Sequence, residues 1–196
     1  DIVVMENVPE ATNYCGDNIP QKACDILESN GYDCIWTLLN SADFGVPQIR
    51  ERVFVIAFKK NLGIEILLPE PTNRRGDFNP TFMSSRIAKF DQYKNFRKPK
   101  IADGKLPLWY TVKDAISDLP ELFKNPLCQY TLVRANKSVK YKHGPLNSFQ
   151  ELMRKTESGM KEGVSDHRFR RTNRDFKIFD KMKEGDNYRD AIRIAE

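Results

Sequence analysis

One carboxylate and two guanidinium groups stand at the ends of two apolar segments near the start of this 196-residue chain. The first apolar segment, residues 2–5, ends at Glu6. The second, residues 53–58, starts directly after Arg52, with Arg50 two positions earlier. Groups of these types can form charge-assisted hydrogen bonds to one planar polar ligand if their strands share a sheet. The residue types therefore indicate a binding site for a heterocycle.

A helix is expected between the two apolar segments. Asn18 can cap it with Pro20 in the first turn, and Asn30 with Gly31 can end it. Its length suits a crossover between two strands. Three side chains are expected to share its apolar face: Ala23, Ile26 and Leu27.

Two strands should follow this helix, at residues 34–39 and 52–58. The second is almost continuously apolar, which favours burial on both of its faces. Residues 68–82 contain three prolines and a glycine and are expected to form a linker or long loop. After this loop the composition shifts from apolar strands to polar, basic and irregular sequence.

The order and spacing of these residues resemble the middle of the bacterial DNA cytosine-5-methyltransferases. In that family a Glu-Asn-Val strand end and a Gln-x-Arg-x-Arg strand start hold a target cytosine that has been flipped out of the duplex. The resembling segments in this chain are residues 6–8, 39–47, 48–52, 111–120 and 183–190.

The resemblance assigns catalytic roles to three residues. Glu6, in its protonated form, would donate to nitrogen 3 of the cytosine and accept from its exocyclic amine. Arg52 would donate to oxygen 2, and Arg50 would contact a phosphate or orient the pocket. The residues expected to bind the substrate are Asn7, Val8, Asn40 and Gln48, the last by stabilising its loop.

A plainer interpretation of the same residues stays open. Glu6 can be an ordinary strand-end carboxylate in an ion pair. Arg50 and Arg52 can form a surface salt-bridge set with Glu51.

The resemblance also implies a fold and partners. Residues 1–68 would be one side of a Rossmann-like methyltransferase sheet in an α/β domain, with its last strand antiparallel. Residues 69–196 would be a small, irregular α+β target-recognition region, expected to be incomplete. The implied cofactor is S-adenosylmethionine, the implied partner is double-stranded DNA, and the implied setting is a restriction-modification system.

Two family motifs are missing upstream of Glu6: the glycine-rich turn for the cofactor and the Pro-Cys nucleophile. None of the four cysteines directly follows a proline, and in residues 126–128 a leucine separates Pro126 from Cys128. We therefore expect an excised piece of a longer enzyme that is inactive by itself. An exposed strand edge at residues 2–6 would then favour non-native self-association.

An alternative hypothesis treats the chain as a non-catalytic DNA-binding module or as one subunit of a split methyltransferase. It rests on the same missing motifs. Mixing with a cofactor-binding partner would restore activity to a split enzyme.

Composition is compatible with a polyanionic partner, since the net charge is +5 and the isoelectric point is about 9.0. Basic residues cluster at 74–75, 86–100, 134–142 and 161–177, often with Phe or Tyr between them. Such clusters can contact phosphates and stack on bases, but equally they can be solvated faces whose aromatic residues point into a core.

Other residue types exclude several kinds of site. The cysteines have no CxxC pair, so neither a zinc site nor a disulfide scaffold is expected. His143 and His167 lie among basic residues and are assigned no catalysis. With no signal peptide and no long apolar run, a cytoplasmic location is the default and no membrane partner is expected.

Two short helices are expected in the second region. Thr111 and Asp114 form a capping-box pattern, with Val112, Ile116 and Leu119 facing inward. Ser148 and Glu151 repeat this pattern, ahead of an inward face formed by Phe149, Leu152 and Met153.

Overall fold

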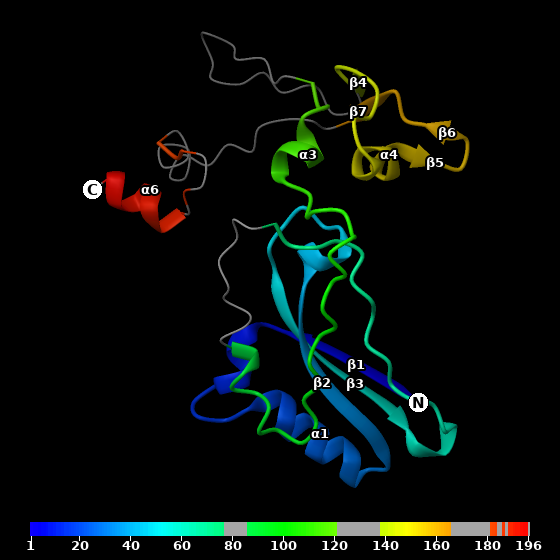
Figure 1. Ribbon diagram of the computed structural model, residues 1–196, viewed down its shortest axis with the longest axis vertical. Coiled ribbons are helices and arrows are strands. Elements are labelled where there is room, and N and C mark those ends of the chain that lie inside the picture. The colour runs from blue at the N-terminus through cyan, green and yellow to red at the C-terminus, as the bar shows by residue number, and fades with distance from the viewer. Residues whose placement is uncertain (77–85, 121–137, 166–180, 184–185, 187, 196) are drawn as a thin grey trace. The chain divides into compact units, whose positions relative to one another are not determined.

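The computed structural model describes residues 1–76, 86–120, 138–165, 181–183, 186 and 188–195 (Figure 1). The chain divides into two compact units. The first consists of Asp1–Ser117 and Leu146–Met153, and the second of Asp118–Pro145 and Arg154–Glu196. A boundary in function after residue 68 stays a prediction, although the compact unit around the first sheet extends well beyond that residue.

Three strands form the sheet of the first unit, in the order β1, β3, β2 (Figure 1). They are β1 (Ile2–Asn7), β2 (Tyr32–Asn40) and β3 (Glu51–Lys59). β3 is antiparallel to both neighbours, so β1 and β2 run in the same direction. The α/β class and the antiparallel last strand are confirmed, whereas a Rossmann-like sheet stays a prediction.

Helix α1 (Ile19–Ser29) connects β1 to β2, after the short 3₁₀ helix η1 (Pro9–Asn13). As predicted, Asn18 caps α1, because its Oδ1 accepts the backbone N–H of Gln21 at 2.9 Å. Gly31, with φ of 84°, lets the chain turn into β2. Ile26 was expected on the apolar face but is 65% exposed, so that part of the prediction is wrong.

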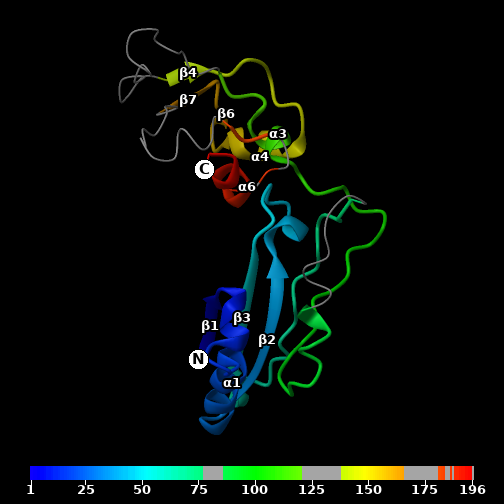
Figure 2. The same cartoon turned by 90° about the vertical axis from the view of Figure 1, so that its left-hand side faces the viewer.

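The core of the first unit is built around Trp36 of β2, which is fully buried. Phe90 and Phe96 pack on its ring, with centroids 5.1 and 4.7 Å away. Figure 2 shows α1 against the sheet, and Cys24 of α1 is fully buried in the same core. The other buried members of this core are Cys34, Leu38, Val53, Val55 and Ala57.

The two faces of β3 differ in burial. Val53, Val55 and Ala57 are buried, but the alternate residues Phe54 and Ile56 are only partly buried. The expectation of burial on both faces is therefore wrong for the described residues, because α1 and the aromatic cluster cover one side. β3 is followed by η3 (Lys60–Leu62).

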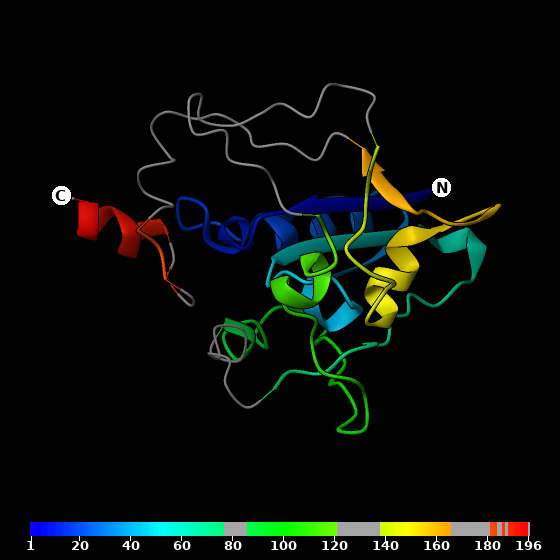
Figure 3. The same cartoon turned by 90° about the horizontal axis from the view of Figure 1, so that it is seen from above.

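β1 is an edge strand of this sheet and lies beside β3 in the view from above (Figure 3). Its side chains Ile2 and Val4 are 58% and 62% exposed. The predicted open edge is thus present in the described part of the chain. Apolar side chains on an unpaired edge favour pairing with another chain.

The outer edge of β2 is partly closed by residues 95–97. The N–H of Trp36 donates to the carbonyl of Asn95, and the N–H of Arg97 donates to the carbonyl of Trp36, both at 2.9 Å. The Asn95 side chain, which is buried, also donates to the carbonyl of Cys34 at 2.8 Å. A segment far along the sequence therefore belongs to the first sheet.

Helix α3 (Val112–Ile116) has the predicted capping box between Thr111 and Asp114. Its expected inward face is wrong, since Val112 and Ile116 are 63% and 52% exposed while Leu119 is partly buried. Within the described residues these two apolar side chains of α3 are therefore left uncovered.

Helix α4 (Ser148–Arg154) is capped one residue earlier than predicted, because Asn147 Oδ1 accepts the N–H of Gln150. Leu152 and Met153 are exposed, contrary to expectation, and Phe149 is partly buried against Tyr110. The buried residue of this helix is Gln150, whose amide donates to the carbonyl of Asp114 at 2.6 Å. The polar side chain of Gln150 takes the buried position because it makes hydrogen bonds to backbone groups there.

The second unit contains the two-stranded sheets β4 (Ser138–Lys140) with β7 (Gly163–Ser165), and β5 (Lys155–Thr156) with β6 (Gly159–Met160). Its centre is a buried ion pair: Arg154 Nε donates to Asp118 Oδ2 at 2.8 Å, and the guanidinium lies 3.6 Å from the centroid of the Tyr141 ring. Helix α6 (Tyr188–Ala195) follows.

Candidate functional site

Glu6 and Arg52 meet on one face of the first sheet. Glu6 lies opposite Phe54 in the register, and Arg52 is two residues before Phe54, so the two side chains project to the same side. Arg52 Nε lies 2.7 Å from Glu6 Oε1. The side chain of Glu6 is 50% exposed and that of Arg52 only 19%, so the acid is open to a ligand and the arginine is held within the fold.

The guanidinium of Arg52 is fixed at a second point. Its Nη1 donates to the backbone carbonyl of Glu51 at 2.6 Å. The Glu51 carboxylate itself pairs with Arg86, at 3.1 Å, while Arg52 pairs with Glu6. A salt-bridge set of Arg50 and Arg52 with Glu51 is therefore not what the described residues form. An ordinary ion pair of Glu6 is what they do form, and the role of Glu6 and Arg52 toward a ligand stays a prediction.

The loop between β2 and β3 includes the 3₁₀ helix η2 (Ser41–Phe44) and is closed by side chains at its base. Asn40, which is buried, accepts the N–H groups of Ala42 and Arg50 through its Oδ1. Ser41 Oγ donates to the carbonyl of Gln48 at 2.6 Å. Gln48 and Arg50 themselves have exposed side chains. Asn40 thus acts on the loop that leads to Arg52, and its role toward a substrate stays a prediction.

The end of β1 is exposed at the two residues after Glu6. Asn7 Oδ1 accepts the N–H of Val8 at 2.8 Å, which folds the amide side chain back onto its own backbone. Val8 is 42% exposed. Both residues directly follow Glu6 in the sequence, and their role toward a substrate stays a prediction.

The basic segment 86–100 is largely neutralised within the first unit. Four of its cations have carboxylate partners: Arg86 with Glu51, Lys94 with Glu28, Lys98 with Asp91 and Lys100 with Glu70. Its interleaved aromatic residues pack on Trp36, so the alternative in which they point into a core holds for this segment. Residues 134–137 and 166–177 of the other basic clusters, and His167, lie outside the described residues.

Comparison with known proteins decides the family. A sequence model of the C-5 cytosine-specific DNA methylases matches residues 1–193. The chain belongs to this family. A type II methyltransferase of Oceanobacillus iheyensis, M.OihORF3336P, is 49% identical over 201 residues, which cover 100% of this chain and 43% of that protein. M.AquIA of a Picosynechococcus species is 34% identical over 125 residues, covering 60% of this chain and 43% of its own length.

This member of the C-5 cytosine-specific DNA methylases therefore spans less than half the length of these two relatives. Among its described residues no glycine-rich turn follows a strand, and the use of S-adenosylmethionine stays a prediction. No group of His, Cys, Asp and Glu side chains in the same described ranges could hold a metal ion.

Three of the four cysteines of this family member lie among the described residues, and the absence of a nucleophile from the chain stays a prediction. Cys24 and Cys34 are buried, and Cys15 is exposed in a tight turn with φ of 52°. Cys128 lies outside the described residues. No helix in the described part of the chain is long and apolar enough to cross a membrane.

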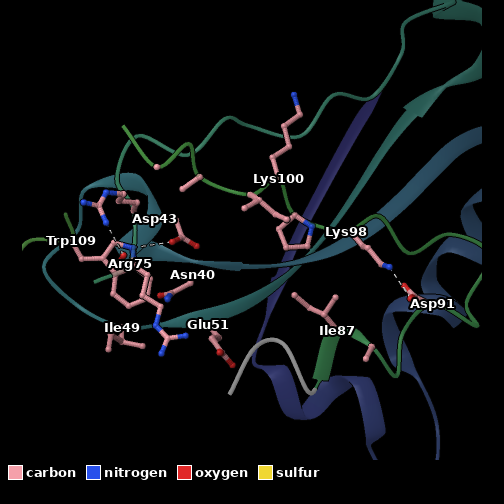
Figure 4. A pocket seen from close by; sticks show the side chains of 16 residues that line it. Asn40, Asp43, Ile49, Glu51, Arg75, Ile87, Asp91, Lys98, Lys100 and Trp109 are labelled. Atoms are coloured by element: carbon pink, nitrogen blue, oxygen red, sulfur yellow. Dashed lines mark hydrogen bonds and ion pairs between the residues drawn. The ribbon is translucent and has the colours of Figure 1, made fainter. Parts of the chain in front are cut away.

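A cavity of about 830 Å³ in the first unit includes Asp43, which the sequence did not single out (Figure 4). Burial raises the pKa of the Asp43 carboxyl, and a hydrogen bond from Trp109 Nε1, at 2.9 Å, partly opposes this. Burial likewise raises the pKa of Glu51, against the lowering effect of the Arg86 charge. Membership of Asp43 in the 39–47 motif was the only sequence signal for it. Other lining residues are Asn40, Ile49, Ile87, Lys98 and Lys100.

Proposed function

We propose that this chain is the part of a DNA cytosine-5-methyltransferase that holds the target cytosine, with Glu6 and Arg52 as the residues that contact it. The observation that supports this is the pair itself, an acid and a guanidinium 2.7 Å apart on one face of one sheet. The family membership supplies the reaction class, because the family is that of the C-5 cytosine-specific DNA methylases.

The proposed reaction requires the cytosine to leave the duplex, since a stacked and paired base cannot be reached by a nucleophile. The flipped base would present its Watson-Crick edge to Glu6. Addition of a thiolate at carbon 6 would move negative charge toward nitrogen 3 and oxygen 2. Glu6, protonated, would donate to nitrogen 3, and Arg52 would donate to oxygen 2.

Selectivity for cytosine would come from the same carboxyl group. Its second oxygen can accept from the exocyclic amine of cytosine, whereas thymine has a carbonyl at that position. A site that leaves such a polar group unpaired binds the wrong base less well. Arg50, with its exposed side chain, would contact a phosphate of the duplex.

The rest of the enzyme would supply what this chain does not contain. The nucleophilic cysteine and the S-adenosylmethionine site would lie in other parts of the polypeptide, so the chain alone should be inactive. Its three-stranded sheet would be one side of a Rossmann-like sheet. The names of the relatives, type II methyltransferases, favour a restriction-modification system acting on duplex DNA in the cytoplasm.

Two variants of the intact protein test the assignment: Glu6→Gln and Arg52→Ala. Methyl incorporation into unmethylated duplex DNA should fall by about 10²–10³-fold in each, the typical loss for a donor at a developing negative charge. Glu65→Gln, an exposed carboxyl of the same unit, is the matched control and should be fully active. Unchanged methylation by both site variants would refute the proposed roles.

A further inference from the structure

Glu51 is connected to both faces of the sheet at the first residue of β3. Its backbone carbonyl accepts from Arg52 Nη1 at 2.6 Å. Its side chain points to the opposite face, because adjacent residues of a strand alternate. There its Oε2 accepts from Arg86 Nη1 at 3.1 Å. A charge on one face can thus influence the orientation of Arg52 on the other.

The start of β3 is held by only one neighbouring strand. Pairing with β1 ends at Val53, opposite Asn7. Arg52 and Glu51 pair with β2 alone, opposite Leu39 and Asn40. Because these two residues lack hydrogen bonds to β1, side-chain contacts contribute more to fixing the peptide between Glu51 and Arg52.

The Glu51 carboxylate needs its partner. The side chain is only 14% exposed, and burial raises its pKa, which shows that the charged form is poorly solvated there. Removing one member of a poorly solvated ion pair is costly because the other charge stays unpaired. Without Arg86 the carboxylate would have to take up a proton or move toward water, and either change would disturb the carbonyl that holds Arg52.

Arg86 is well placed to act as a fixed point. It begins the segment that packs on β2, and its carbonyl accepts the N–H of Lys89 at 3.0 Å. Phe90 and Phe96, a few residues later, are buried against Trp36. The Arg86 side chain is partly exposed, at 43%, but its backbone is tied to the core of the same unit.

We propose that Arg86 is a positioning residue: through its ion pair with Glu51 it fixes the start of β3, and so aims the Arg52 guanidinium at the target base. The inference rests on the proposed function of Glu6 and Arg52. It assigns a role to a residue that lies 35 positions after Glu51 and outside the segments that resemble the family's motifs.

A double-mutant cycle in the intact protein tests this proposal. Arg86→Met keeps most of the side-chain length and removes the charge, and it should lower kcat for methylation about tenfold with little change in KM for DNA. Arg86→Lys keeps a charge and should retain most of the activity. The double variant Glu51→Gln with Arg86→Met should be more active than Arg86→Met alone, because no unpaired carboxylate remains.

Lys22→Met is the matched control, since it breaks the exposed ion pair with Asp17 in the same unit and should leave kcat unchanged. Full activity of Arg86→Met, or a double variant that loses the sum of the two single losses, would overturn the proposal. If Arg86→Met does not fold, the comparison of Arg86→Lys with Glu51→Gln and the double variant still decides it.

The two proposals fail in distinguishable ways. If Arg52→Ala methylates DNA as well as the unchanged protein, the proposed function fails and Arg86 has nothing to position. If Arg52→Ala is inactive while Arg86→Met is fully active, only the inference about Arg86 is wrong.

Discussion

The side-chain oxygen of Asn40 accepts the backbone N–H of Arg50 at 3.1 Å, and so joins the last residue of β2 to the residue before β3. The same oxygen accepts the N–H of Ala42 at 3.2 Å. Asn40 is 2% exposed, so water cannot easily replace it. The buried side chain of Asn40 therefore holds together the loop between β2 and β3, which leads to Arg52.

Replacing this amide should destabilise the fold. In Asn40→Ala two backbone N–H groups lose their acceptor, and leaving the buried N–H of Ala42 unsatisfied costs about 1–3 kcal/mol. The free energy of unfolding, measured by denaturant titration of the intact protein, should fall accordingly. Asn61→Ala, at an exposed position of η3, should leave it unchanged. Equal stabilities for the two variants would contradict the bracing role.

The buried ion pair of the second unit should be sensitive to loss of either partner. Arg154 and Asp118 have side chains only 5% and 4% exposed. Arg154→Met should therefore cost about 3–5 kcal/mol of unfolding free energy. The exposed pair of Lys98 and Asp91 should contribute less than about 1 kcal/mol when broken by Lys98→Met. A cost for Arg154→Met no larger than this would show that the pair is not the centre of the unit.

The thiols should differ in reactivity. A hydrogen bond with Cys34, together with burial, raises the pKa of Cys24 far above its ordinary value, and the two sulfur atoms are 2.7 Å apart. Because the thiolate is the reactive form, iodoacetamide should label the exposed Cys15 first. Peptide mass spectrometry after a short pulse measures this, with denatured protein as the control. Labelling of Cys24 as fast as Cys15 would be inconsistent with the described core.

Asp43 should make stability depend on pH. Burial, the larger influence, raises its folded pKa above the unfolded value despite the Trp109 hydrogen bond. Such a group favours folding below its unfolded pKa, and this contribution is lost as pH rises through the folded pKa. The unfolding free energy of Asp43→Asn should therefore exceed that of the unchanged protein by a larger amount at pH 7 than at pH 4. The same substitution at the exposed Asp17 should show no such difference.

The edge of β1 should promote self-association of the isolated chain. Val4 is 62% exposed on this edge strand. Val4→Lys places a charge there, which natural edge strands use against pairing, and should lower the mass measured by light scattering at high concentration. If the unchanged chain has the mass of a monomer at high concentration, the edge of β1 does not promote self-association.

The sequence by itself determined the local elements of the first unit. The cap at Asn18, the turn at Gly31 and the capping box at Thr111 and Asp114 are interactions between residues close in the chain, so their residue types were sufficient to predict them. The motif order also placed Glu6 and Arg52 on strands that meet, and the register confirms that they share a face.

Only the tertiary structure decided which long-range partners each side chain has. Glu51 pairs with Arg86, and Phe90 and Phe96 cover Trp36, because residues 86–97 fold back on β2. Local patterns could not show this: they placed Leu152 and Met153 inside and overlooked Gln150, whose buried amide binds the backbone of another helix. Burial depends on what covers a surface, and that covering comes from distant parts of the chain.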